Sequence, residues 1–309
     1  MSKVNIKSMI MLLLTAFIWG VAFVAQSVGM KFVGPFTFTC VRSLLGGLVL
    51  IPCIWFLKKM NKQGKEKEKK PLTSPEKKVL LAGGICCGLA LFVASNLQQF
   101  GVKYTTVGKA GFITALYIVL VPILGLFLKK KVGIKVWISV AISVAGLYLL
   151  CITEKLSISK GDFFVLLCAG AFAVHILVID YFSPRTDGVK MSCIQFFVCS
   201  ALSAVLMLIF EEPSVAGILG AAVPLLYAGI MSSGVAYTLQ VLAQKDTDPT
   251  IASLILSLES VFSVLAGWVV LHEILSVREI TGCCLMFGAI ILAQLPDKKK
   301  EKLEVVAEQ

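Results

Sequence analysis

The chain alternates between long apolar runs and short polar segments along its whole length. The apolar runs are about 20 residues long, the length that a helix needs to cross ~30 Å of hydrocarbon. Each run is continuously apolar rather than alternating, which favours helices as the membrane-crossing elements. Ten such runs are present: Ser8–Met30, Pro35–Leu57, Lys78–Gly101, Thr105–Leu128, Gly133–Ile152, Gly161–Phe182, Val189–Phe210, Leu219–Leu242, Thr250–Leu271 and Ser276–Leu295. The pattern predicts an all-α integral membrane protein with ten transmembrane helices.

Composition supports a membrane protein over a soluble one. Of the 309 residues, 58% are hydrophobic and only 15% are charged, whereas soluble domains are about half apolar and a quarter charged. The first apolar run is long enough to span and lacks a clear small-residue cleavage site, so we expect a helix rather than a cleaved signal. The ten cysteines fall in or at the ends of apolar runs without CxxC spacing, and we expect buried thiols rather than disulfides or metal ligands.

Lys and Arg are distributed unevenly between the two sets of connecting segments. With the N-terminus placed inside, 22 of the 29 Lys and Arg residues lie on the inner side, which predicts that both termini are cytoplasmic. The net charge of +11 is therefore an orientation signal. The Lys-rich inner loop fits a bacterial inner (plasma) membrane. We expect a cytoplasmic Lys-rich loop at 58–77 and a disordered cytoplasmic tail at 296–309.

The Lys-rich stretch "KKMNKQGKEKEKK" (Lys58–Lys70) has two further readings. It could bind anionic lipid, or it could be a solvated loop that only fixes the topology. Aromatic residues are not interleaved with its lysines, so no nucleic-acid partner is expected.

The second half of the chain repeats the first. "NLQQFGVKYT" (Asn96–Thr105) and "TLQVLAQKDT" (Thr238–Thr247) share Leu, Gln, Lys and Thr in one register, 142 residues apart. A shift of 153 aligns the starts of the halves and places Arg42 opposite Gln195. We therefore predict two five-helix repeats, 8–153 and 161–295. Five is an odd number of crossings, so the second repeat is inverted, an arrangement that builds a transport site near the midplane.

Four motifs resemble the EamA family of the drug/metabolite transporter (DMT) superfamily. They are "AFIWGVAFVAQ" (Ala16–Gln26), "PFTFTCVRSLLGGLVLIP" (Pro35–Pro52), "TTVGKAGFITALYIVLVPILGLFL" (Thr105–Leu128) and "LSLESVFSVLAGWVVLHEILS" (Leu256–Ser276). The resemblance implies ten helices and the export or exchange of amino acids, related metabolites or drugs, often linked to protons. The chain departs from the family pattern at Ser260, where Pro is usual, and at His272, where Gly usually precedes the closing Glu273.

Glu259 is the strongest candidate for a functional residue. It lies near the middle of the ninth apolar run, where an ionised group costs about 3 kcal/mol or more. Carboxyl groups withdrawn from water can exchange protons near neutral pH, so Glu259 is a candidate for both substrate binding and proton coupling. A structural hydrogen bond between helices is the alternative. Its repeat partner is Tyr117, a second candidate for substrate binding.

Three further ionisable residues lie within apolar runs. Arg42 could bind a substrate carboxylate in bidentate fashion, or its side chain could extend to the interface. His175, near the centre of the sixth run, could bind substrate and relay protons, or could be a buried neutral imidazole. Lys109 could line the outer mouth of a substrate site or extend to the lipid interface.

Four uncharged residues complete the predicted substrate-binding set. Gln98 and Gln240 occupy equivalent repeat positions, where they could serve a gate or hydrogen-bond between helices. Trp19 and Tyr237 could line the cavity, and packing between helices is the alternative.

The function predicted from these features is secondary active transport of a small metabolite or drug. The chain has no Gly-rich phosphate loop and no arrangement typical of a hydrolase or a metal site, so we expect no enzymatic activity and no cofactor. A non-transporting membrane sensor or scaffold is the alternative. The expected partners are the substrate and membrane lipids, and a homodimer stays open.

Overall fold

The computed structural model describes residues 5–63, 73–105, 107–130, 132–151, 159–271 and 276–295. These residues form helices and no strand, and helix is present in every predicted apolar range. The elements are α1 (Ile6–Gly29), α2 (Pro35–Gln63), α3 (Ser74–Tyr104), α4 (Val107–Ala115), α5 (Tyr117–Phe127), α6 (Ile134–Cys151), α7 (Lys160–Phe182), the 3₁₀ turn η1 (Ser183–Arg185), α8 (Gly188–Phe210), α9 (Val215–Gly220), α10 (Ala222–Leu226), the π-helix η2 (Tyr227–Tyr237), α11 (Thr238–Gln244), α12 (Pro249–Leu256), α13 (Glu259–Leu271) and α14 (Val277–Gln294).

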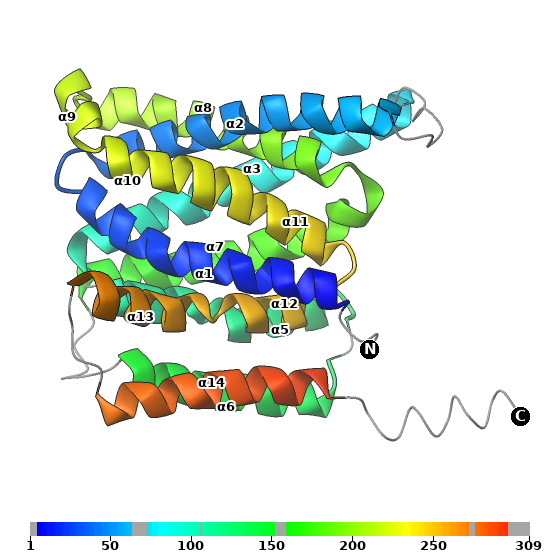
Figure 1. Cartoon of the computed structure of the whole chain (residues 1–309), viewed down its shortest axis with the longest axis vertical. Coiled ribbons are helices and arrows are strands. Elements are labelled where there is room, and N and C mark those ends of the chain that lie inside the picture. The colour runs from blue at the N-terminus through cyan, green and yellow to red at the C-terminus, as the bar shows by residue number, and fades with distance from the viewer. Residues whose placement is uncertain are drawn as a thin grey trace, which may run out of the picture.

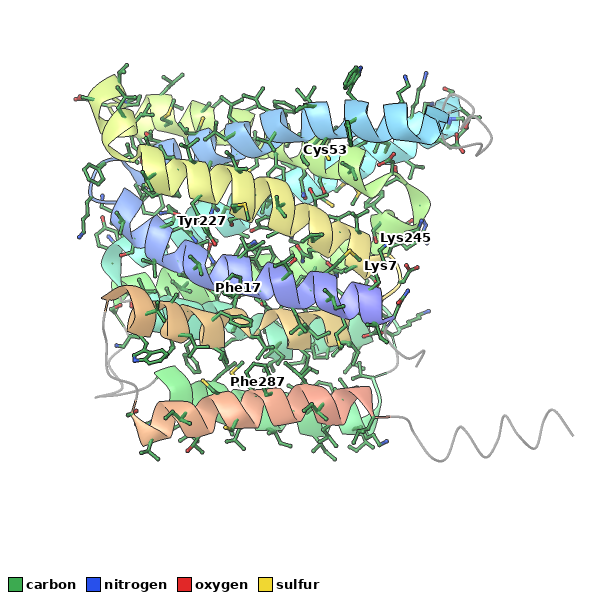
Figure 2. The ribbon with its side chains drawn as sticks, in the orientation of Figure 1. Lys7, Phe17, Cys53, Tyr227, Lys245 and Phe287 are labelled. Carbon is green, nitrogen blue, oxygen red and sulfur yellow. The ribbon has the colours of Figure 1, made fainter. Side chains whose placement is uncertain are left out.

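Length and hydropathy support membrane crossing for most of these helices. In the described part of the chain, eight helical stretches are long and apolar enough to span, while the apolar parts of α6 and α14, Ile134–Leu149 and Ile280–Ala293, are shorter. Large apolar side chains cover the outside of the bundle. Phe17 and Phe287 are examples (Figure 2), with 49% and 41% of their surfaces exposed. Such an apolar surface suits contact with lipid.

The helices lie roughly parallel in a stack (Figure 1). One end of the stack is formed by α2, α3 and α8, and the middle by α1, α7, η2 and α11. The broken pairs α4–α5 and α12–α13 follow, and α6 and α14 pack mainly against each other at the opposite end. The start of α1 and the end of α14 lie at the same end of the helices, as do Lys7 and Lys245 (Figure 2).

Two runs that we predicted as continuous helices are interrupted at their centres. The run Thr105–Leu128 breaks at Leu116, where the Leu116 N–H donates to Ile113 O at 3.2 Å. The run Thr250–Leu271 breaks at 257–258, where the Leu258 N–H donates to Ile255 O, also at 3.2 Å. The two breaks are 142 positions apart, the spacing of the repeat. Each tightens the backbone to a 3₁₀-type turn before the helix resumes.

Proline does not cause either interruption. Pro122 lies within α5, after the break. The chain also breaks before Ser260, although this position lacks the proline usual in the family. The eighth predicted run, Leu219–Leu242, also differs from a plain α-helix, because it contains the π-helix η2.

The predicted Lys-rich loop is shorter in the structure than in the sequence analysis. Residues 58–63 continue α2 and residues 74–77 begin α3, so both ends of the predicted loop 58–77 are helical. Its central part, 64–72, lies outside the described residues, as do the predicted tail 296–309, His272 and Glu273.

The start of α2 is fixed by the side chain of the residue that follows α8. The carboxylate of Glu211 accepts hydrogen bonds from the N–H groups of Phe36 at 2.9 Å and Thr37 at 2.8 Å, and from the Thr37 hydroxyl at 2.6 Å. A carboxylate suits these unpaired N–H groups of a helix start. Gly34 leaves room for this carboxylate, since a Cβ there would lie 2.2 Å from Glu211 Cδ. This cap holds α2, which carries Arg42.

Candidate functional site

A small cavity lies inside the bundle, between both halves of the chain. Its volume is about 20 Å³, roughly the space of one water molecule. The lining residues come from α1, α2, α3, α4, α5, α7, η2, α11 and α13: Trp19, Ala22, Phe23, Gln26, Arg42, Gln98, Thr114, Tyr117, Phe172, Ile176, Ser232, Tyr237, Gln240 and Glu259. Seven of the nine residues that the sequence predicted for substrate binding are in this lining.

Glu259 and Arg42 are the charged residues of the lining. Both are almost fully buried, with 3% of their surface exposed. Glu259 is the first residue of α13, directly after the helix break, and Tyr117 has the equivalent place at the start of α5. The Tyr117 hydroxyl lies close enough to Glu259 for electrostatic interaction. Neither that hydroxyl nor Glu259 Oε1 has a hydrogen-bond partner of ordinary geometry among the described residues.

Some of the unsatisfied polar atoms belong to residues that line this cavity. Among the described residues, five lining side chains carry a buried polar atom without a hydrogen-bond partner: Gln26 Oε1, Arg42 Nε, Tyr117 OH, Gln240 Oε1 and Glu259 Oε1. Leaving such an atom unpaired costs about 1–3 kcal/mol, and more for a charged group. These atoms include donors and acceptors, so the cavity is suited to a ligand or water that supplies both.

Aromatic rings form one wall of the cavity. The rings of Trp19 and Tyr237 lie 4.5 Å apart between centroids, tilted by 55°. The indole Nε1 of Trp19 donates a hydrogen bond to Ser232 O at 3.4 Å. This contact joins α1 to η2 and fixes the orientation of the indole. The wall can contact flat apolar groups and can also face a cation.

The repeated glutamines are placed at opposite ends of the lining. Gln98 lies in the last third of α3 and donates from Nε2 to Thr114 Oγ1 at 3.5 Å. Gln240 lies in α11, near the end of the bundle where Lys245 is found (Figure 2). The lining therefore extends toward both ends of the helices.

Two predicted residues lie outside the lining. The His175 ring is fully buried, with its Nε2 3.1 Å from Gln195 Oε1 and its centroid 5.9 Å from that of Tyr237. It stands behind the aromatic wall. Lys109 is near the start of α4, with its Nζ 3.9 Å from Asp162 Oδ2, so it links α4 to α7.

Several lining residues were not predicted. Phe23, Phe172 and Ile176 are apolar, and Ala22, Thr114 and Ser232 are small and uncharged. A usable signal existed for some of them, because the shift of 153 pairs Trp19 with Phe172 and Phe23 with Ile176. Within the described residues, no group of three or more His, Cys, Asp or Glu could hold a metal ion.

A comparison with known protein families matches the two halves of the chain separately. Residues 6–152 and again 159–295 match the EamA-like transporter family. The chain belongs to the EamA-like transporter family. Its two matches cover nearly the same ranges as the two predicted repeats.

Relatives and solved structures agree with this assignment. An "Uncharacterized transporter" of Archaeoglobus fulgidus is 31% identical over 92% of this chain and 84% of its own length. YoaV of Bacillus subtilis, named a transporter, is 22% identical over 91% of this chain and 96% of its own length. A crystal structure superposes with a TM-score of 0.75 at 19% identity, covering 94% of this chain and 96% of that one, and thus shares the fold. The EamA protein is therefore a multi-pass membrane transporter.

Proposed function

We propose that this EamA-family protein is a secondary active transporter that works by alternating access. The observation that carries the proposal is the central cavity, in which buried donors and acceptors without partners lie at mid-length of an apolar bundle. A protein that served only as a scaffold would gain nothing from such unpaired groups. In a transporter, the substrate supplies the missing partners.

Two inverted five-helix repeats are the second part of the proposal. Four pairs of lining residues support it: Trp19 with Phe172 and Phe23 with Ile176 are 153 positions apart, and Gln98 with Gln240 and Tyr117 with Glu259 are 142 apart. A site built from such pairs is what two related halves produce when they enclose a common centre.

Contacts between α2 and α8 support the same symmetry. The Ser200 hydroxyl donates to Cys40 O at 3.0 Å, and the Cys193 thiol donates to Gly47 O at 3.6 Å. Cys40 and Cys193 are 153 positions apart, and so are Gly47 and Ser200. The two residue pairs are therefore repeat images of each other, although the donor lies in α8 in both contacts.

The small cavity means that the transport cycle must include a conformation in which the cavity is wider. Binding sites for small molecules usually measure about 300–1,000 Å³, whereas this cavity measures about 20 Å³. In this conformation the cavity therefore has no room for a substrate molecule. Rocking one repeat against the other would open the cavity to each side in turn.

The chemistry of the lining favours a small metabolite or drug with polar ends. Glu259 suits an amine or a proton, Arg42 suits a carboxylate, and the aromatic wall suits a flat or apolar body. We propose export or exchange of such a compound across the plasma membrane, with both termini cytoplasmic. Glu259 would carry the proton where transport is proton-coupled.

Everted vesicles with an acidic interior test the proposal. A pH-sensitive dye reports proton release while amino acids, amines, nucleosides and cationic drugs are added in turn. We expect one chemical class to release protons from vesicles with the protein and not from empty vesicles. No proton release, together with no isotope counterflow of any class, would instead favour a non-transporting sensor or scaffold.

A further inference from the structure

The π-helix η2 is unlike its counterpart in the first half. Residues 85–95, at the equivalent repeat positions, belong to the regular α-helix α3, whereas Tyr227–Tyr237 forms 11 residues of π-helix. π-helices are rare, are mostly confined to single turns, and occur often at functional sites. The segment contains Gly229, Ser232, Ser233 and Gly234, residues with weak α-helical preference.

Two side chains of α1 bind backbone carbonyls of η2. The Thr15 hydroxyl is 3.1 Å from Ala236 O and 2.9 Å from Met11 O of its own helix, so its one proton is shared between two acceptors. One turn further along α1, the Trp19 indole donates to Ser232 O. The donors are four residues apart on α1, and the acceptors are four residues apart on η2.

These contacts determine the position of the aromatic wall. Tyr237 is the last residue of η2, and its ring packs on Trp19. Trp19 and Ser232 both line the cavity, whereas Thr15 does not. Thr15 is fully buried, and its hydroxyl is its link to η2.

We propose that η2 and Thr15 form a latch that holds Trp19 against Tyr237 in the closed cavity, and that a change of η2 from π to α register opens it. An α-helix has one residue fewer in each hydrogen-bonded turn, so the change rotates one flank of η2 relative to the other. Ser232 O and Ala236 O are four residues apart and share a face in an α-helix as well, whereas the Tyr237 ring, five residues after Ser232, then turns away from that face and from Trp19. The proposal rests on the proposed function in one respect, that the opened cavity admits substrate.

We expect the hydroxyl of Thr15, rather than the shape of its side chain, to hold η2 against α1. Replacement by Val keeps the shape and removes the donor to Ala236 O, while replacement by Ser keeps the donor. We expect Thr15→Val to expose Trp19 to water and Thr15→Ser to behave as the wild type.

Acrylamide quenching of Trp19 measures this exposure directly. Three of the four tryptophans, Trp55, Trp137 and Trp268, are replaced by Phe so that Trp19 alone reports. We expect a several-fold larger quenching constant in Thr15→Val than in wild type and Thr15→Ser, without substrate present. Equal quenching in all three proteins would overturn the proposal.

A one-residue deletion tests the register itself. Deleting Met231, which is 39% exposed in η2, shortens the segment by one residue and favours an α-helix over the wider π-helix. Deleting Leu89, its equivalent in α3 and 47% exposed, is the matched control. It should disrupt α3, which is already a regular α-helix. We expect the Met231 deletion to fold with raised Trp19 quenching, and a folded deletion variant that quenches as the wild type would contradict the latch.

These readouts are independent of transport. If the Met231 deletion does not fold, the Thr15 pair still decides the question, because both changes are isolated substitutions. Raised quenching in a protein that moves no substrate would contradict the proposed function and leave the latch supported.

Discussion

Glu259→Gln is expected to abolish substrate-driven proton release in everted vesicles while the protein still inserts and purifies as a folded species. Glutamine has the shape of glutamate but neither binds nor releases a proton in the physiological range. Glutamine also keeps an oxygen that can face Tyr117, so the replacement should leave helix packing intact. The dye response should fall to that of empty vesicles.

Isotope counterflow then separates two roles of this carboxyl. A variant that loses proton release but keeps counterflow assigns Glu259 to proton coupling, and loss of both assigns it also to substrate binding. Glu212→Gln is the matched control, since Glu212 is an exposed carboxylate away from the cavity. Full proton release by Glu259→Gln would contradict any role of this residue in coupling.

Gly20→Ala is expected to lower both stability and transport. Gly20 lies next to Trp19, and a Cβ at this position would lie 2.5 Å from Phe262 Cβ and 2.8 Å from the Glu259 carbonyl oxygen. The neighbouring atoms belong to the backbone and the first carbon of a side chain of α13, so they cannot move without the helix. Overpacking of this kind typically costs about 1–3 kcal/mol. Displacement of α13 would also move Glu259.

Thermal unfolding in detergent and vesicle flux measure the two consequences. Gly170→Ala in α7 is the control, because a Cβ there meets no atom within 4 Å and alanine favours helix more than glycine does. We expect a lower melting temperature for Gly20→Ala and no loss for Gly170→Ala. Equal melting temperatures and wild-type flux in both variants would show that α1 and α13 can separate freely.

The helices could be predicted well from the apolar pattern, but their interruptions could not. Each predicted run overlaps a helix, since about 20 continuous apolar residues leave few alternatives in lipid. The breaks at Leu116 and at 257–258 occur among residues with no proline or glycine at the break. They depend on packing between the two halves, which a single run does not reveal. The π-helix η2 likewise depends on its contacts with α1 and α2.

The polar part of the site could be predicted and the apolar part could not. Glu259 and Arg42 are unusual in an apolar run because burial of a charge is expensive, so each is conspicuous. Phe172 and Ile176 look the same in sequence as residues that face lipid, and only the fold shows that they line a cavity. His175 is equally conspicuous as a buried titratable group, yet it lies one layer behind Tyr237.

Two-sided access to the cavity tests the central claim most directly. Ala22 lines the cavity and is 1% exposed, so Ala22→Cys in a cysteine-free background reports whether water reaches it. A membrane-impermeant sulfonate thiol reagent is applied to sealed right-side-out and everted vesicles. Alternating access predicts that reagent applied to either face reacts with this thiol. Reaction from one face should then prevent reaction from the other. Reaction from one face alone, or from neither, would contradict it.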